Sequence, residues 1–306
     1  MKNIFMVAAT MLLAAACHRA TVPAATTLVN TPVMNTEIKN ESGQTILAGH
    51  ASISAMQMPD YKTWFDDSYN KYTIDAAATE QLKPLLQNKR IEIFLGSWCG
   101  DSRREVPRMI KILQHAGMDT AKLALIFVDN STAAYKQSPQ HEEQGKNIHH
   151  VPSIIIYDDK KEMGRIIESP LVSLEKDMLA ILQQQPYQPN YHAIDYWIKQ
   201  VPARTKNMSD AELQKQVVTL KPLCRHYGEF NGYGYVLLAA NNTTEALNVF
   251  RLNTMIYPDN ASVFDSLAEA QESIGNKKEA ITAYEKVLVL KPGDEKAKGK
   301  IAALKM

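Results

Sequence analysis

The stretch of sequence that decides the fold is Ile91-Glu92-Ile93-Phe94-Leu95-Gly96-Ser97-Trp98-Cys99-Gly100-Asp101-Ser102. Its first five residues form a short run that is apolar except for Glu92, which is typical of a buried β-strand. Residues 96–100 form a turn bounded by glycine, and residues 101–113 continue with apolar positions at helical spacing. Cys99 is therefore expected between the end of a strand and the first turn of a helix. Free backbone amides at such a helix start stabilise a thiolate.

Segments on both sides extend this pattern. Upstream, residues 76–87 predict a helix, although Pro84 is unfavourable near its end. Downstream, short apolar runs predict buried strands, and a charged turn predicts a hairpin. The expected elements are strand 91–95, helix 101–113, strand 123–128, a polar loop or broken helix to Asn147, strand 153–157, strand 163–168 and helix 172–182. This order predicts an α/β sandwich.

Residues 85–185 resemble the thioredoxin family. The matching pieces are strand 91–95, Trp98-Cys99-Gly100, Asp129, Val151-Pro152-Ser153 and the hairpin at 160–167. The resemblance implies a thioredoxin-like domain at 60–185 with an N-terminal extension. It also implies that Cys99 is a nucleophile with Trp98 beside it, and that Pro152 is a cis-proline facing it.

The segment departs from the family pattern at three positions. Ser102 stands where the family usually has a second cysteine, so a mixed disulfide at Cys99 would await an outside thiol. Asp101 replaces a common proline and opposes a thiolate, whereas Arg103 favours one. Ile93 occupies the place where many members bury an acid. His150, next to Val151-Pro152, is expected to tune the thiol.

Several interpretations of Cys99 remain open at this point. It could be a single-thiol exchange centre acting on a thiol or disulfide protein substrate, or a relic in a fold kept for binding. It could also pair with Cys224, although a buried structural role for Cys224 is the simpler hypothesis. Cys99 with His149-His150 could ligate a metal, but we expect neither a metal nor another cofactor. The matching enzyme class is a thiol-disulfide oxidoreductase or isomerase, and the alternative is a non-catalytic interaction scaffold.

The C-terminal part predicts an all-α domain. Residues 183–190 have the composition of a linker, and a spacing of 34 residues relates Gly234 to Ala268, Ala246 to Ala280, Phe250 to Tyr284 and Pro258 to Pro292. This pattern resembles tetratricopeptide repeats, expected over 227–306 with a cap helix from 294 to 305. Residues 186–226 are expected to be a helical linker region that could supply a divergent extra pair. Stacked repeats predict a protein partner.

The N-terminus predicts export. Residues 1–16 form a positive start followed by a short apolar run, as in a signal peptide. Residues 13–17 resemble a bacterial lipobox, which implies lipidation of Cys17 and a tether over 17–59, in which a short strand is expected near Thr45–Leu47. The chain would then face the periplasm as a membrane lipoprotein, held by its N-terminal lipid anchor only. With 34 basic and 33 acidic residues spread along the chain, nucleic acid is not an expected partner.

Overall fold

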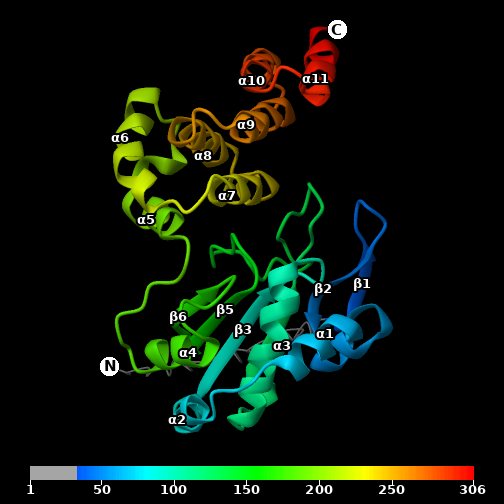
Figure 1. Cartoon of the computed structure of the whole chain (residues 1–306), viewed down its shortest axis with the longest axis vertical. Coiled ribbons are helices and arrows are strands. Elements are labelled where there is room, and N and C mark those ends of the chain that lie inside the picture. Colours follow the sequence, from blue (N-terminus) through cyan, green and yellow to red (C-terminus); the bar gives the residue numbers. More distant parts are fainter. Residues whose placement is uncertain (1–32) are drawn as a thin grey trace, which may run out of the picture. The chain divides into compact units, whose positions relative to one another are not determined.

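The computed structural model describes residues 33–306 (Figure 1). The expected signal segment 1–16, Cys17 and the first part of the expected tether lie outside the described residues. Residues 33–182 contain a mixed six-stranded sheet with helices, and the C-terminal region is all-helical. Among residues 33–306, no helix has the length and apolar character needed to cross a membrane.

The sheet joins its strands in the order β1-β2-β4-β3-β5-β6. β3 and β4 are parallel, and the other neighbours are antiparallel. Ile93 in the middle of β3 pairs with Leu125 of β4 on one side and with Ile154 of β5 on the other. The strands are β1 (Thr36–Lys39), β2 (Thr45–Ala51), β3 (Lys89–Leu95), β4 (Leu123–Phe127), β5 (Ser153–Asp158) and β6 (Lys161–Ile167). The four strands predicted from the sequence are confirmed, with ends that differ by at most two residues.

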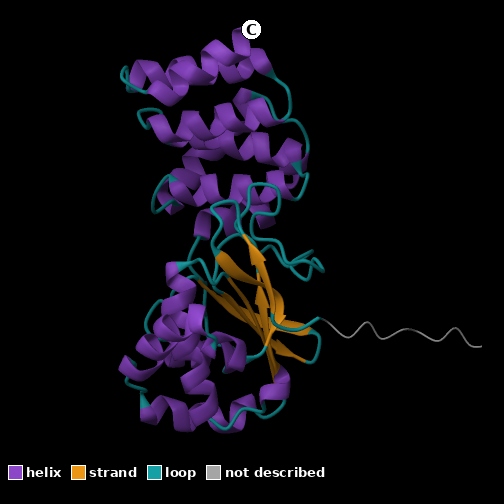
Figure 2. Cartoon of the chain, turned by 90° about the vertical axis from the view of Figure 1, so that its right-hand side faces the viewer, coloured by secondary structure: helices purple, strands orange, loops and turns teal. Residues whose placement is uncertain are grey.

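Four helices pack on one face of this sheet (Figure 2). Alternate residues of β3, namely Ile91, Ile93 and Leu95, are fully buried in that layer, as the period of a strand requires. Val106 and Met109 of α3 are equally buried in it. The helices are α1 (Pro59–Lys71), α2 (Ala76–Leu86), α3 (Gly100–His115) and α4 (Leu174–Leu182). This layer is the main core of the N-terminal region.

The opposite face of the sheet is covered by a loop. Phe94 of β3 and Ile155 of β5 point to this side and pack with Ile148 and Val151 from the loop that precedes β5. Residues 129–150 form turns. Of the two structures expected for this segment, a polar loop or a broken helix, the structure therefore has the loop. The helices of the N-terminal region therefore lie on one face, and a smaller apolar cluster occupies the other.

The expected tether at 17–59 is wrong for residues 36–57, although the short strand expected near Thr45–Leu47 is confirmed as the start of β2. This segment forms β1, β2 and a short 3-10 helix, Ile53–Gln57. Ile46 and Leu47 of β2 are fully buried, and β2 pairs with β4, whose edge it covers. The ordered N-terminal region therefore begins before residue 60.

Helices α5 to α11 form the C-terminal region. The first four share one apolar cluster around Trp197, Phe230 and Phe250, and the last three share another around Tyr284. The expected linker region 186–226 thus contributes α5 and α6 to the helical core. The helices are α5 (His192–Gln200), α6 (Asp210–Leu220), α7 (Gly228–Ala239), α8 (Thr243–Ile256), α9 (Ala261–Ser273), α10 (Lys277–Leu290) and α11 (Glu295–Lys305).

The residues related by the 34-residue spacing lie at equivalent places in two successive helix pairs. In the first pair, Gly234 of α7 faces Phe250 of α8 so closely that a Cβ atom at Gly234 would lie 2.5 Å from the ring. In the second pair, Ala268 of α9 and Tyr284 of α10 are both fully buried in one cluster. A small residue on one helix therefore admits an aromatic side chain of the next in both pairs.

Candidate functional site

Cys99 is the residue that immediately precedes helix α3. Its backbone is extended, with φ −87° and ψ 127°, and its carbonyl accepts the first helical hydrogen bond, from Arg103 N at 3.0 Å. The amide of Cys99 donates to Gly96 O at 3.0 Å, which closes the turn after β3. The thiol is partly buried, and no side-chain cap is present at this helix start. The sequence prediction of a cysteine between strand and helix is confirmed.

The loop before β5 faces the thiol. Cys99 Sγ lies 3.3 Å from the carbonyl oxygen of Val151, to which the thiol donates. The Val151-Pro152 peptide bond is cis, as the resemblance implied. Pro152 O accepts a hydrogen bond from Glu168 N at 2.7 Å, which fixes the loop to the end of β6. Cys99 and Pro152, which are 53 positions apart in the sequence, are thus brought together.

Trp98 folds back over the turn that precedes it. Its Nε1 donates to the carbonyl of Val128 at 2.8 Å, and its ring lies 6.4 Å from that of Tyr135. A Cβ atom at Gly96 would lie 2.5 Å from the indole, so only glycine leaves room for it. Trp98 therefore forms one wall beside Cys99, as expected.

Ser102 has a structural role in this site. It is 1% exposed, and its Oγ accepts a hydrogen bond from the backbone amide of Gly96 at 3.2 Å. Neighbouring charges are also engaged: Asp101 pairs with Arg104 at 2.6 Å, and Arg103 Nε donates to Ser97 O at 2.5 Å. Asp101 and Arg103, expected to tune the thiol, thus both take part in local contacts at the start of α3.

Lys136 is a buried charged residue, on the loop that precedes β5, that the sequence analysis missed. It is 5% exposed, and its Nζ donates to His149 O at 2.7 Å and lies 4.8 Å from the ring centroid of Tyr135. Burial lowers the pKa of Lys136 to about 8, against the opposing effect of the charges of Cys99 and Glu168. Burial, followed by the charge of Cys99, raises the pKa of Tyr135. Lys136 lies in a polar loop without periodicity, so no sequence signal pointed to it.

His149 and His150 are buried against the helical region. Their Nδ1 atoms are 2.8 Å apart, and the ring of His150 stacks on Tyr191 at 3.9 Å. Burial is the main cause that lowers the pKa of His149, to about 3, and that of His150. Two neutral rings can share one hydrogen bond, with one nitrogen donating and the other accepting. His150, expected to tune the thiol, instead makes its contacts with His149, Tyr191 and the surface of helix α7 at Gly232.

The other described cysteine lies in a different cluster. Cys224 packs in the apolar core of the helical region, whereas Cys99 packs in the cluster behind the sheet. Both are free thiols. Burial raises the pKa of Cys224 to about 12, and its Sγ donates to Leu220 O at 3.3 Å. Cys224 therefore fits the structural role weighed for it. Among residues 33–306, no group of three or more His, Cys, Asp or Glu side chains is arranged to hold a metal ion.

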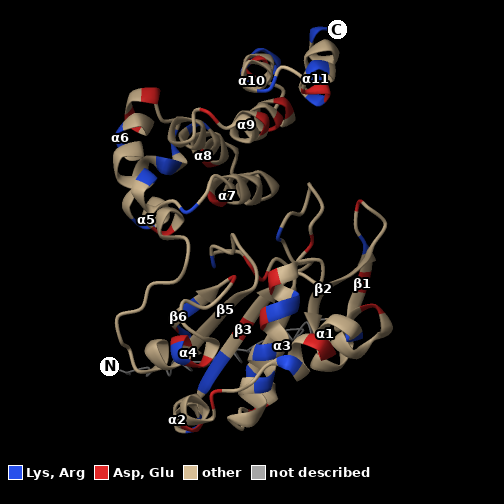
Figure 3. Cartoon of the chain, viewed as in Figure 1, with Lys and Arg blue, Asp and Glu red and all other residues tan. Residues whose placement is uncertain are grey.

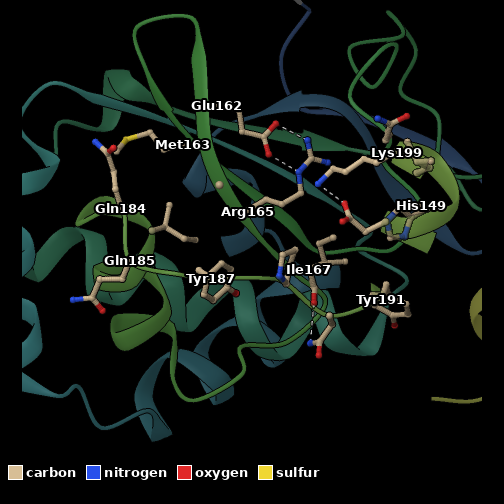
Figure 4. Close-up of a pocket in the computed structure, with 17 residues that line it drawn as sticks. His149, Glu162, Met163, Arg165, Ile167, Gln184, Gln185, Tyr187, Tyr191 and Lys199 are labelled. Carbon is tan, nitrogen blue, oxygen red and sulfur yellow. Dashed lines mark hydrogen bonds and ion pairs between the residues drawn. The ribbon is translucent and has the colours of Figure 1, made fainter. Parts of the chain in front are cut away.

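Two cavities lie beside this site, and Cys99 lines neither of them. One, of about 600 Å³, lies between β6 and α5 (Figure 4). Its central cation, Arg165, is held by both carboxylate oxygens of Glu162 at 2.6 Å. The other, of about 450 Å³, lies between the loop 136–148 and the C-terminal half of α7. Lys136 lines this second cavity together with Tyr233.

Charge is mixed over the described surface. Figure 3 shows Lys and Arg together with Asp and Glu on both the sheet region and the helical region. Comparison with protein-family models and with curated proteins gave no match for this chain. The functional assignment therefore depends on the residues and the geometry described above.

Proposed function

We propose that this protein carries out thiol–disulfide exchange with Cys99 as its single nucleophilic thiol. The observation that carries the proposal is the position of Cys99, partly exposed at the N-terminus of a 16-residue helix and facing the cis Val151-Pro152 peptide. A thiolate at this place gains from the helix dipole and from free amide donors. Reactive cysteines occupy such environments.

The arrangement of the sheet supports a thioredoxin-like assignment for this region. The parallel pair β3-β4, the antiparallel strands β5 and β6, and helices α3 and α4 follow one another in the order that the resemblance implies. β2 adds an antiparallel strand beside β4 from a segment that lies before the residues covered by the resemblance, and residues 129–150 form turns, as the expected polar loop requires.

The proposed reaction is limited to one thiol. The Cys99 thiolate attacks a substrate disulfide, forms a mixed disulfide and releases the other substrate sulfur as a thiolate. Ser102 cannot displace the bound product, and its hydroxyl is already engaged with Gly96 N. A second thiol, from the same substrate or from another protein, must therefore resolve the intermediate. This is chemistry of the isomerase kind, or of a reductase with an external thiol.

The helical region is proposed to be a tetratricopeptide-type module that binds a protein partner. The equivalent pairs Gly234–Phe250 and Ala268–Tyr284 support the assignment, and stacked helix pairs present surfaces suited to peptides. The proposed location is the bacterial envelope, as a periplasm-facing lipoprotein anchored through Cys17. That part of the proposal rests on residues 1–17, which are outside the described residues.

A non-catalytic scaffold is the second candidate, and one contact favours it. The loop before Val151-Pro152 packs against the chain's own helical region through His150 and Tyr191. One side of the surroundings of Cys99 is therefore already occupied, which suits a domain kept for binding.

Reactivity of Cys99 separates the two candidates. We would measure the iodoacetamide reaction rate of the purified Cys224→Ser chain against pH, and trap mixed disulfides with a model disulfide. Fast alkylation near neutral pH, with a mixed disulfide that Cys99→Ser abolishes, supports exchange. A thiol that reacts only after denaturation would reject exchange and leave the scaffold.

A further inference from the structure

Tyr191 joins the helical region to the loop that carries Val151 and Pro152. It directly precedes α5, and only 2% of its surface is exposed. Its ring stacks on the ring of His150, with the centroids 3.9 Å apart and the planes at 16° to each other. Its hydroxyl donates a hydrogen bond to the carboxylate of Glu168. One side chain of the helical region therefore contacts both the loop before β5 and the residue that follows β6.

The two residues that Tyr191 contacts flank the carbonyl that faces the thiol. Cys99 Sγ donates to Val151 O at 3.3 Å, and His150 directly precedes Val151. On the other side, the backbone amide of Glu168 donates to the carbonyl of the next residue in the loop at 2.7 Å. The tyrosine thus holds the chain immediately before and immediately after the acceptor of the thiol.

The backbone and the surroundings of Tyr191 show that the fold fixes it in this place. Its φ of 75° and ψ of 44° lie in the left-handed region, which is unfavourable for a bulky residue and persists only where the surrounding contacts hold it. His149 and Tyr191 lie at the same end of the cavity between β6 and α5 (Figure 4). Helix α7 closes the other side, because a Cβ atom at Gly232 would lie 3.2 Å from His150 Nε2. The position of the loop before β5 therefore depends on contacts with the helical region.

The stacked rings keep one protonation state around neutral pH. Burial, followed by the hydrogen bond to Glu168, raises the pKa of Tyr191, so its hydroxyl remains a donor. Burial is the main cause that lowers the pKa of His149, to about 3, and that of His150. Two further charged groups act on the tyrosine hydroxyl, Glu229 and Arg225. A change in the reactivity of the site between pH 6 and pH 10 therefore does not come from titration of these rings.

We propose that Tyr191 is a positioning residue for Cys99, which holds the Val151 carbonyl against the thiol and so favours the protonated form of the thiol. The inference rests on the proposed exchange function and deepens it by assigning a contact that regulates the same site. A thiol donates a hydrogen bond only while it is protonated, so a fixed acceptor stabilises the thiol over the thiolate. The N-terminus of α3 has the opposite effect. A movement of the helical region that withdraws Tyr191 releases the carbonyl and leaves the effect of the helix.

The test compares full-length Tyr191→Leu and Tyr191→Phe with a matched control. Leucine removes both the stacked ring and the hydrogen bond to Glu168, whereas phenylalanine keeps the ring. Tyr187→Leu is the control, because Tyr187 belongs to the same linker and its hydroxyl also donates to a carboxylate, that of Asp177 in α4, at 3.0 Å. The control therefore loses an equivalent hydrogen bond that does not lead to the loop before β5.

The reactivity of Cys99 against pH is the measurement. All variants carry Cys224→Ser, and the rate of alkylation by iodoacetamide is followed from pH 6 to pH 10. We expect Tyr191→Leu to raise the rate at pH 7 about threefold, which corresponds to the loss of one weak hydrogen bond. At pH 10, well above the ordinary thiol value of about 8.5, its rate should equal that of the parent chain. Tyr191→Phe should lie between the two, and Tyr187→Leu should match the parent chain throughout.

A second variant keeps the inference testable if Tyr191→Leu does not fold. Gly232→Leu places a side chain of α7 against His150, so it displaces the loop from the helical side while Tyr191 is unchanged. Its rate should also rise at pH 7 and not at pH 10, and an unchanged profile would overturn the inference.

Two results with a folded Tyr191→Leu chain would overturn the inference. One is an unchanged profile, and the other is a rate that rises equally at pH 7 and pH 10, which is the effect of a thiol that is only more exposed. In both cases a reactive Cys99 would leave the exchange function standing. A parent chain in which Cys99 does not react until it is denatured would overturn both.

Discussion

Helix α7 offers a quantitative test of how closely the helices of the C-terminal region pack. Gly234→Ala adds one methyl group whose carbon would lie 2.5 Å from Cζ of Phe250 and 2.8 Å from two further ring atoms. Carbon atoms in contact are about 3.5–4.0 Å apart, so the ring or the helix must move by about 1 Å. Phe250 is fully buried and also packs edge-on against Tyr235, which leaves the ring little room to move.

The expected magnitude follows from two opposing effects. Replacing glycine by alanine inside a helix gains about 1 kcal/mol of intrinsic propensity, whereas overpacking a filled core costs about 1–3 kcal/mol. Gly234→Ala should therefore leave the free energy of unfolding unchanged or lower it by up to about 2 kcal/mol. Gly299→Ala is the matched control in α11, because a Cβ atom there meets nothing within 4 Å. Gly299→Ala should raise the free energy of unfolding by about 1 kcal/mol.

Urea unfolding followed by tryptophan fluorescence measures both variants. Trp197 is fully buried in the cluster that contains Phe250, so its emission reports the unfolding of this part of the helical core. The double variant Gly234→Ala/Phe250→Leu should recover part of the loss, since the smaller side chain frees the space. The reasoning is refuted if Gly234→Ala stabilises the protein as much as Gly299→Ala does.

Three further outcomes are expected. Glu229→Gln should raise the free energy of unfolding at pH 7 by about 1 kcal/mol, because Glu229 is buried with one carboxylate oxygen unpartnered. Burial raises the pKa of Glu229, so the parent chain loses stability as pH rises above about 4.3, the pKa of this carboxyl in the unfolded chain. Urea midpoints of the parent chain and of Glu229→Gln, measured from pH 4 to pH 8, should therefore converge at the acid end. Midpoints that do not converge there would contradict this. Cys224, whose pKa is raised to about 12 by burial, should be alkylated far more slowly at pH 8 than a cysteine peptide, and mass spectrometry that finds equal rates would reject the assignment. Ser102→Ala should lower the free energy of unfolding, measured in urea, by about 1–3 kcal/mol, because the buried amide of Gly96 loses its acceptor. An unchanged free energy of unfolding would argue against that hydrogen bond.

The central strands and helices of the sheet region were predictable because one periodicity dominates each of them. The run 91–95 is apolar except for Glu92, since both faces of the sheet are covered there. Of the hairpin of β1 and β2, the sequence predicted only a short strand near Thr45–Leu47, and β1 was missed for the opposite reason. β1 is an edge strand of four residues that is only partly buried. The apolar run Ile46-Leu47 is short, and the rest of its strand, β2, is defined by pairing with β4, which lies far away in the sequence.

The candidate site was predictable where it is local and unpredictable where it depends on long-range contact. Trp98, Cys99 and Ser102 belong to one turn, so their spacing carries the information. Lys136 is buried beside the carbonyl of His149 by a loop in which its own backbone takes a positive φ of 58°. The direction in which His150 points is set by Tyr191, a residue of the helical region. A lysine or histidine in a polar segment carries no signal of such contacts, because packing across the fold determines them.

The role of Ser102 also constrains the proposed chemistry. Its hydroxyl satisfies the buried amide of Gly96, in the turn that holds Cys99 and leaves room for Trp98. A cysteine at position 102 would present sulfur, a weaker acceptor, to the same amide. Adding a second thiol would therefore weaken the turn that presents the first. The single-thiol arrangement is built into the hydrogen bonding of this site, so any exchange at Cys99 must be completed by a thiol from outside it.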